Sequence, residues 1–230
     1  MTRAGKRKHI HTVIDYNSAR IAGLNTDWEE LLHLGNKLCY AKNTIIPHET
    51  AKGIFYLTKG TVELSYNNAS GHKRIALYYG PGTLINEARS LTGHNLGGTF
   101  TCMEAVELYQ FNKDLCSEDF IRTHPHLIRN LLKTMAVKML LHYCFVTSMG
   151  TGSHLSLVCR FILSSAAAHG SPSHFSLGMT QQEVADLIGM HRATLARALQ
   201  KLKRMGVIEK FTATSVRISD YATLEKLAGD

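Results

Sequence analysis

The sequence predicts an α+β fold: an N-terminal, jelly-roll-like β-roll, then one long helix, then a C-terminal winged helix-turn-helix. Three observations predict this order. Short β-rich segments separated by turn residues fill the first half of the 230-residue chain. A helical pattern then runs from about Pro125 to Met149. Two short amphipathic helices that meet at Gly189 come last, and an alternating segment follows them.

Length and charge agree with this division. At 230 residues the chain is long enough for two domains, and its 44% hydrophobic and 19% charged residues are ordinary for a globular protein. The net charge is +8, and residues 1–17 and 151–230 each carry an excess of three basic residues. Two basic ends favour an anionic partner. We expect a basic N-terminal arm at 1–22, the roll at 23–118, the long helix at 119–150 and the winged domain at 151–230.

Targeting and cysteine patterns exclude several classes. There is no signal-peptide core and no long apolar run, so we expect a cytoplasmic protein with no membrane partner. The five cysteines are an odd number without a C-x-x-C pair, which argues against a disulfide framework and a structural zinc site. We therefore assign no metal, and we expect reduced, buried thiols.

The roll is predicted from short segments that are rich in β-branched and aromatic residues. A short amphipathic helix at 25–35, with Trp28, Leu31 and Leu32 inward, comes before it. Glycine, proline and asparagine separate the following segments, as expected for a barrel or sandwich. The predicted strands are 44–46, 54–57, 61–66, 74–79, 99–102 and 106–111.

The long helix carries a repeat with alternating spacings of four and three. The repeat comprises Ile128, Leu132, Met135, Met139, His142, Val146 and Met149. Such a seam is typical of helices that pair side by side, so we predict a parallel homodimer; the alternative is a helix buried against its own roll. His142 is the polar member, either a haem or metal ligand, a proton-sensitive contact, or a hydrogen-bonded histidine that fixes register. A hinge at 150–153 and a helix at 154–169 follow.

The C-terminal segment has the layout of a helix-turn-helix. Thr180 and Glu183 form a capping box, and Gly189 provides the turn. His191 begins the second helix, which has Leu195, Leu199 and Leu202 on its inner face and basic residues on the other. Gly206 ends this helix, and residues 207–211 and 215–218 predict a hairpin wing. The pattern indicates a helix for the major groove of double-stranded DNA; the alternative is a helical hairpin with a solvated basic face. The DNA-facing candidates are Thr180, Gln181, His191, Arg192, Thr194, Arg197 and Lys201.

This order of elements resembles the CRP/FNR family of bacterial transcription regulators over about residues 20–228. The matching residues are 53–64, Gly71 and 80–85 in the roll, together with the helix-turn-helix. The resemblance implies a cyclic-nucleotide-binding-type roll, a homodimer on a two-fold symmetric operator, and RNA polymerase as a further partner. It also implies that Arg192 and Arg197 contact the groove and that Thr194 contacts phosphate. Ala193 stands where family members commonly have glutamate, which shifts the expected base readout.

The effector region departs from the family pattern. Members that bind cyclic AMP have a Gly-Glu pair and a later arginine for the phosphate, whereas this chain has Asn86-Glu87 and then Gly97-Gly98-Thr99. A cyclic nucleotide is therefore not expected, and no cysteine precedes Cys39 to form the family's iron-sulfur cluster. Residues 78–85 resemble the branch that senses chlorinated phenols, which suggests a small, partly aromatic effector of unknown identity.

Candidate effector residues lie between the roll and the long helix. They are Tyr79, Asn86, Glu87, Arg89, Ser90, Thr99, Thr101, Met135 and Met139. The alternatives are that the methionines are core residues and that Glu87 and Arg89 pair with each other on the surface.

Three functions remain to be compared. The leading one is a dimeric, sequence-specific transcription regulator, not an enzyme, that a small effector or a redox signal controls. The second is a regulator that binds DNA constitutively and has a vestigial pocket. The third is a cupin-like metal enzyme that would use His48-Glu49, His72 and His94, all of which lie beside turn signals rather than inside strands.

Overall fold

The computed structural model describes residues 13–15, 19–47, 53–67, 73–95, 97–111, 117–148, 153–171 and 173–229, without the side chains of 13–15 and 144–148. They form two compact units. One contains most of the roll and the long helix up to Val137, and the other contains the C-terminal domain from Lys138 onward together with the described residues of 15–19 and 65–76.

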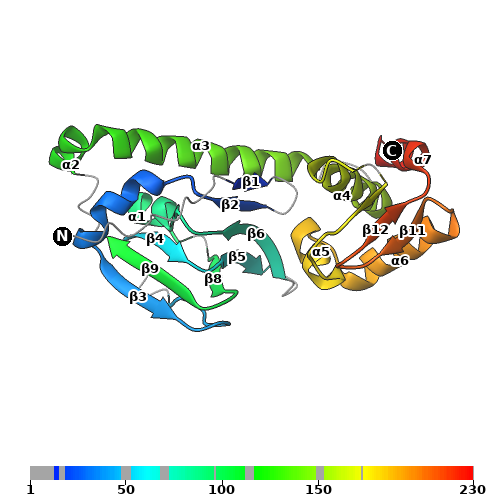
Figure 1. Cartoon of the computed structure of the whole chain (residues 1–230), viewed down its shortest axis with the longest axis horizontal. Coiled ribbons are helices and arrows are strands. Elements are labelled where there is room, and N and C mark those ends of the chain that lie inside the picture. Colours follow the sequence, from blue (N-terminus) through cyan, green and yellow to red (C-terminus); the bar gives the residue numbers. More distant parts are fainter. Residues whose placement is uncertain are drawn as a thin grey trace, which may run out of the picture. The chain divides into compact units, whose positions relative to one another are not determined.

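The described strands of the roll form two sheets. One sheet has the strand order β1-β2-β6-β5-β8 and the other has the order β3-β9-β4-β7 (Figure 1). The strands of the first are β1 (Val13–Asp15), β2 (Arg20–Ala22), β5 (Val62–Asn67), β6 (Lys73–Tyr79) and β8 (Thr99–Cys102). Those of the second are β3 (Asn36–Tyr40), β4 (Ile54–Lys59), β7 (Thr83–Ile85) and β9 (Val106–Phe111).

The second sheet is antiparallel, and its crowding explains one glycine. Strand β4 pairs with β9 and with β7, so that Tyr56 lies opposite both Tyr109 and Leu84. Gly53, which leads into β4, has φ +107°, and a Cβ at this position would lie 2.1 Å from the carbonyl oxygen of Phe111. Only glycine fits this conformation and this close approach.

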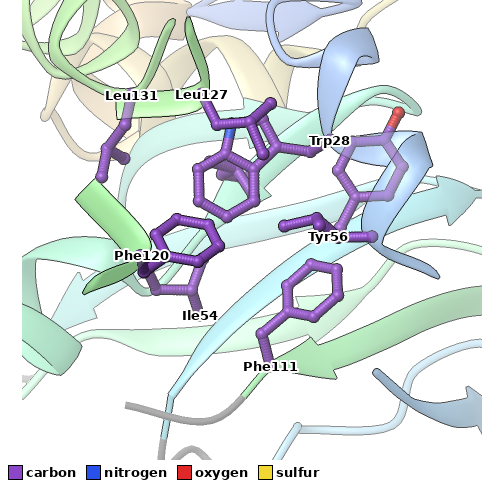
Figure 2. Close-up of a cluster of buried hydrophobic side chains, with 9 residues drawn as sticks. Trp28, Ile54, Tyr56, Phe111, Phe120, Leu127 and Leu131 are labelled. Carbon is purple, nitrogen blue, oxygen red and sulfur yellow. The ribbon is translucent and has the colours of Figure 1, made fainter. Parts of the chain in front are cut away.

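Several described helices accompany the roll. They are the 3-10 helix η1 (Thr26–Leu34) and the α-helices α1 (Glu87–Thr92), α2 (Glu118–Thr123) and α3 (Pro125–Ser148). Together, η1, α2 and the first turns of α3 cover one face of the second sheet through a cluster around Trp28 (Figure 2). The other members are Leu31, Ile54, Tyr56, Leu84, Phe111, Phe120, Leu127 and Leu131. Full burial of one such side chain is worth about 1.5–3 kcal/mol, so this cluster fixes the start of α3 on the roll.

Several predictions for the roll need correction. The helix expected at 25–35 is a 3-10 helix, and the strand expected at 44–46 is only an isolated bridge between Ile45 and Thr101. The predicted arm at 1–22 includes β1 and β2, and β2 pairs in parallel with β6, so the sheet begins earlier than expected. Helix α1 was not predicted. It starts after Asn86, which adopts the left-handed conformation with φ 69°.

The C-terminal domain is a helical unit with a small sheet. Its helices are α4 (His154–Ala168), α5 (Gln181–Ile188), α6 (Arg192–Arg204) and α7 (Tyr221–Gly229). Strands β10 (His174–Phe175), β11 (Ile208–Phe211) and β12 (Val216–Ile218) form a sheet with the order β10-β12-β11. Helix α4 packs against α5, α6 and α7. The hairpin after α6 confirms the predicted wing, to which the unpredicted β10 adds a third strand.

Candidate nucleic-acid interface and effector site

The first helix of the helix-turn-helix begins at a complete capping box. The hydroxyl of Thr180 accepts a hydrogen bond from the backbone N–H of Glu183 at 3.2 Å, and the carboxylate of Glu183 accepts one from the N–H of Thr180 at 2.6 Å. Two N–H groups that have no helical partner are thereby satisfied. Helix α5 has only eight residues, so this cap is a large part of its local stability.

Gly189 forms the turn between the two helices. It ends α5 in the left-handed conformation with φ 70°, and its N–H donates to the carbonyl of Ala185. His191 is then the N-cap residue of α6 with an extended backbone, and its carbonyl accepts from the N–H of Thr194 at 2.9 Å. The side chain of His191 makes no capping hydrogen bond and is exposed.

Helix α6 separates an apolar face from a basic one. Leu195, Ala198, Leu199 and Leu202 are buried, as the leucine pattern predicted. Five basic residues and no acidic residue lie on α6, and all five are exposed, namely Arg192, Arg197, Lys201, Lys203 and Arg204. Lys203 and Arg204, near the C-terminus of the helix, were not among the candidates.

Two candidate residues on this face contact each other. The guanidinium of Arg197 donates to the hydroxyl of Thr194 at 3.3 Å and to the carbonyl of Ala193 at 3.4 Å. Arg197 therefore lies along its own helix. Both of its hydrogen bonds are long and therefore weak, so the side chain can exchange them for bonds to a base edge. At the start of α5, Gln181 is half-buried and Thr180 is exposed, so this helix end can approach a phosphate.

The end of α6 leads directly into the wing. Gly206 has φ 71° and donates to the carbonyl of Lys203, while Val207 donates to that of Leu202; this is the Schellman pattern. The two wing strands expose Lys210 and Arg217, and Arg217 pairs with Glu209 at 3.3 Å across the hairpin.

The predicted seam on α3 divides into two groups. Ile128 and Met135 are partly buried and pack against the Trp28 cluster of their own protomer. Leu132 and Met139 are 63% and 67% exposed. Ala136 and Tyr143 are also exposed, so the exposed residues 132, 136, 139 and 143 follow one another at spacings of four, three and four. Leu140, which is exposed as well, lies beside them on the helix. We call Leu132, Ala136, Met139, Leu140 and Tyr143 the exposed α3 face.

His142 is also exposed. Desolvation and the positive charge of Lys138 lower the pKa of His142 below its ordinary value, so the imidazole is neutral at neutral pH. The side chain of Val146, residue Met149 and most of the expected hinge at 150–153 lie outside the described part of the chain. Ser153 is described, and its hydroxyl caps α4.

The effector candidates from the roll occupy two neighbouring regions. Tyr79 on β6 is buried, and its ring packs against the ring of Phe100 on β8. The neighbours of Phe100 in the sequence, Thr99 and Thr101, are half-buried. Asn86, Glu87 and Ser90, at and after the start of α1, are buried, and Arg89 is half-buried. The amide of Asn86 donates to the carbonyl of Gly53 at 2.8 Å. Glu87 is 5% exposed, so it does not lie on the surface as the alternative for Glu87 and Arg89 assumed.

A further polar residue in this region carried no sequence signal. Leu84 on β7 faces the Trp28 cluster, so its neighbours Thr83 and Ile85 point to the opposite side of the strand. The hydroxyl of Thr83 is completely buried, and no hydrogen-bond partner for it exists among the described residues. A buried hydroxyl without a partner costs about 1–3 kcal/mol, which a polar ligand could recover.

The described part of the chain gives no support to a metal site. No group of three histidine, cysteine, aspartate or glutamate residues within it could hold a metal ion. His94 is exposed, and His48, Glu49 and His72 of the proposed cupin-like site lie outside the described residues. Burial raises the pKa of the Cys102 thiol, and it raises that of Cys159 to about 11. No described helix has the length and hydropathy that a membrane span requires.

A buried leucine stripe under an exposed basic helix, with a capped helix before it and a wing after it, defines a winged helix-turn-helix DNA-binding protein. Two family models match this chain. The Crp-like helix-turn-helix domain covers residues 158–227, and the cyclic nucleotide-binding domain covers residues 37–118.

The chain belongs to the CRP/FNR family and is a DNA-binding transcription regulator of that type. The nitrogen fixation regulation protein FixK of Bradyrhizobium diazoefficiens is 26% identical over 206 residues, which cover 86% of this chain and 84% of FixK. The cAMP-activated global transcriptional regulator CRP of Haemophilus influenzae is 23% identical over 185 residues, 76% of this chain and 80% of CRP. These relatives are regulators rather than enzymes.

Solved structures share the fold. OCPA-complexed CprK has a TM-score of 0.68 at 18% identity, with 86% of this chain and 92% of that chain covered. A CooA mutant from Carboxydothermus hydrogenoformans has a TM-score of 0.69 at 15% identity, with 90% and 99% covered. The predicted combination of roll and winged helix-turn-helix is thereby confirmed.

Proposed function

We propose that this regulator binds a two-fold symmetric DNA site as a homodimer and reads bases with α6. The observation that carries the proposal is the exposed basic face of α6 above four buried apolar residues. Arg192 and Arg197 read base edges, Thr194 and Lys201 contact phosphate, and Thr180, Gln181 and His191 position the start of the two helices. Ala193 offers a methyl group where a glutamate would accept from cytosine, so the preferred half-site differs from that of members with the glutamate.

The exposed α3 face supports the dimer. Leu132, Met139, Leu140 and Tyr143 are large apolar residues, and each is at least 49% exposed on one side of the helix. Heptad-spaced apolar residues bury their surface by pairing with a second helix, and a two-fold dimer supplies the two recognition helices that a symmetric operator needs. His142 lies at the edge of this face and, as a neutral imidazole, serves as a hydrogen-bonding interface residue rather than a charge.

Gel shifts over genomic fragments test the DNA-binding part of the proposal. We expect a small set of fragments to bind tightly while the rest bind weakly with a steep salt dependence. Equal, salt-sensitive binding of all fragments would contradict sequence-specific recognition. An in vitro transcription assay on a bound fragment then reports whether RNA polymerase responds.

We also propose that a small effector, and not a cyclic nucleotide, binds the inner side of the roll. Tyr79, Asn86, Glu87, Ser90 and Thr83 are all buried. Asn86 replaces the glycine of the Gly-Glu pair of cyclic-AMP receptors, and position 98 offers glycine where their phosphate-binding arginine stands. Arg89, Thr99 and Thr101 border these residues. Met135 and Met139 are weaker candidates, because the first packs on the Trp28 cluster and the second is exposed.

Thermal shifts with two probes test the effector site. The CprK structure with the shared fold is complexed with OCPA, so OCPA and cyclic AMP are the two probes. We expect cyclic AMP to leave the melting temperature unchanged and an aromatic acid such as OCPA to raise it, with the increase reduced in a Thr83→Val variant. An increase with cyclic AMP would contradict the proposal. Equal DNA affinity with and without every probe would favour constitutive binding.

A further inference from the structure

The side chain of Asn25 connects two parts of the roll unit that are far apart in the sequence. Asn25 is fully buried and comes immediately before η1. Its amide nitrogen donates to the amide oxygen of Asn130 and, at 2.7 Å, to the hydroxyl of Thr134, both on α3. Its amide oxygen accepts from the backbone N–H of Leu84 on β7 at 3.0 Å. One side chain therefore bonds both a strand and the long helix.

On the strand side, Asn25 takes the place of a neighbouring strand. Strand β7 is the last strand of its sheet, so no described strand pairs with its outer edge. The N–H of Asn25 donates to the carbonyl of Gly82 at 2.8 Å, and its side chain bonds Leu84, so both contacts hold this edge. Strand β7 ends at Ile85, and the effector candidates Asn86 and Glu87 follow it directly in the chain.

On the helix side, both partners of Asn25 make further hydrogen bonds. The amide of Asn130 donates to the carbonyl of Leu24 at 2.8 Å, and the hydroxyl of Thr134 donates to the carbonyl of Asn130 at 3.1 Å. Thr134 is buried, whereas Leu132 and Met139 are exposed, so the network lies on the side of α3 away from the exposed α3 face. Buried hydrogen bonds have direction, so this network adds a constraint on the axial position of α3 to the apolar packing of the Trp28 cluster.

We propose that Asn25 is a positioning residue that couples β7 to the register of α3. A ligand that displaces β7 pulls on the Leu84–Asn25 bond, and the two bonds to Asn130 and Thr134 transmit the displacement to α3 and its exposed face. The regulatory meaning of this coupling depends on the proposed effector control and homodimer. The coupling itself is a property of the roll unit and is measurable without effector, DNA or a partner.

Amide hydrogen exchange on the full-length protein tests the coupling with a matched pair of variants. Thr134→Val removes the hydroxyl that Asn25 bonds and keeps the shape of the side chain, and Thr134→Ser keeps the hydroxyl. Loss of one neutral hydrogen bond of typical strength predicts exchange at the Leu84 amide about fivefold faster in Thr134→Val. In Thr134→Ser we expect the wild-type rate. A change on α3 would thus be detected on a strand 50 residues away in the sequence.

Thr123→Val is the control. The hydroxyl of Thr123 bonds the carbonyls of its own helix and the ring of His124, and none of these hydrogen bonds involves β7, so Leu84 should exchange as in the wild type. An unchanged Leu84 rate in Thr134→Val would overturn the proposal, as would an equal acceleration at every protected amide of the four-stranded sheet. Asn25→Leu should accelerate amide exchange both at Leu84 and on α3 around Thr134. If that variant does not fold, the two Thr134 variants still test the proposal. Absence of dimer or of specific DNA binding would refute the proposed function and leave this test intact.

Discussion

Shortening Leu132 on the exposed α3 face tests the dimer proposal in a quantitative way. Full burial of a leucine side chain is worth about 1.5–3 kcal/mol, and Leu132 is 63% exposed in the protomer. If pairing covers this fraction, each protomer loses roughly 1–2 kcal/mol in Leu132→Ala, and the symmetric dimer loses about 2–4 kcal/mol. The dimer dissociation constant should therefore rise about 30- to 900-fold.

Sedimentation equilibrium over a range of protein concentrations measures this constant. Leu34→Ala is the matched control, because Leu34 is 58% exposed but lies on η1 rather than α3. We expect Leu34→Ala to leave the dissociation constant unchanged. If Leu132→Ala also left it unchanged, or if both variants weakened the dimer equally, the exposed α3 face would not be the interface.

Three further predictions concern the remaining elements. Thr180→Ala breaks the capping box and should reduce the free energy of unfolding of the C-terminal domain by about 1 kcal/mol in urea denaturation; no loss would mean that the cap does not support α5. Arg197→Ala should cost about 1–3 kcal/mol of specific DNA affinity and relax the preference at one base pair. Lys201→Ala should weaken binding to all DNA sequences alike and reduce the slope of log affinity against log salt concentration by about 1. Identical behaviour of the two variants in anisotropy titrations would refute these roles. Burial raises the pKa of Cys159 to about 11, so this thiol should resist iodoacetamide at neutral pH while the exposed Cys39 reacts. Mass spectrometry detects the label, and rapid labelling of both cysteines would support a redox role for Cys159.

The helix-turn-helix could be predicted because its determinants are close together in the sequence. The capping box spans four residues, and Gly189 closes the turn onto Ala185 four residues before it. The leucine pattern of α6 is a local periodicity, and the leucines that it places on one face are buried in the structure. The wing followed from two alternating segments with a short connection. No distant contact was needed to specify any of these features.

The roll was predicted less well because distant contacts decide its details. Strand β7 has only three residues, and its outer edge depends on Asn25, 59 residues away. Helix α1 has six residues and starts from a left-handed asparagine, so neither its length nor its entry gives a helical signal. Ile45 has the residue type of a strand, yet it forms a single bridge and is 56% exposed.

The seam on α3 shows the same limit within one helix. Met135 and Ala136 both fit an alternating spacing of four and three after Leu132, and the sequence pattern selects the larger side chain. Packing against the Trp28 cluster turns Met135 toward its own protomer and leaves Ala136 exposed. The period of the helix was therefore predictable, whereas the direction of its free face depended on the tertiary structure.

Selection of bound DNA from a random pool tests the central claim most directly, because it reports sequence preference and symmetry together. A pair of recognition helices related by a two-fold axis predicts inverted half-sites whose centres are about one helical turn, 10–10.5 base pairs, apart. Enrichment of such a palindrome would support the homodimer and the α6 interface in one experiment. A pool that shows no enrichment, or that converges on a single unsymmetric half-site, would contradict the claim.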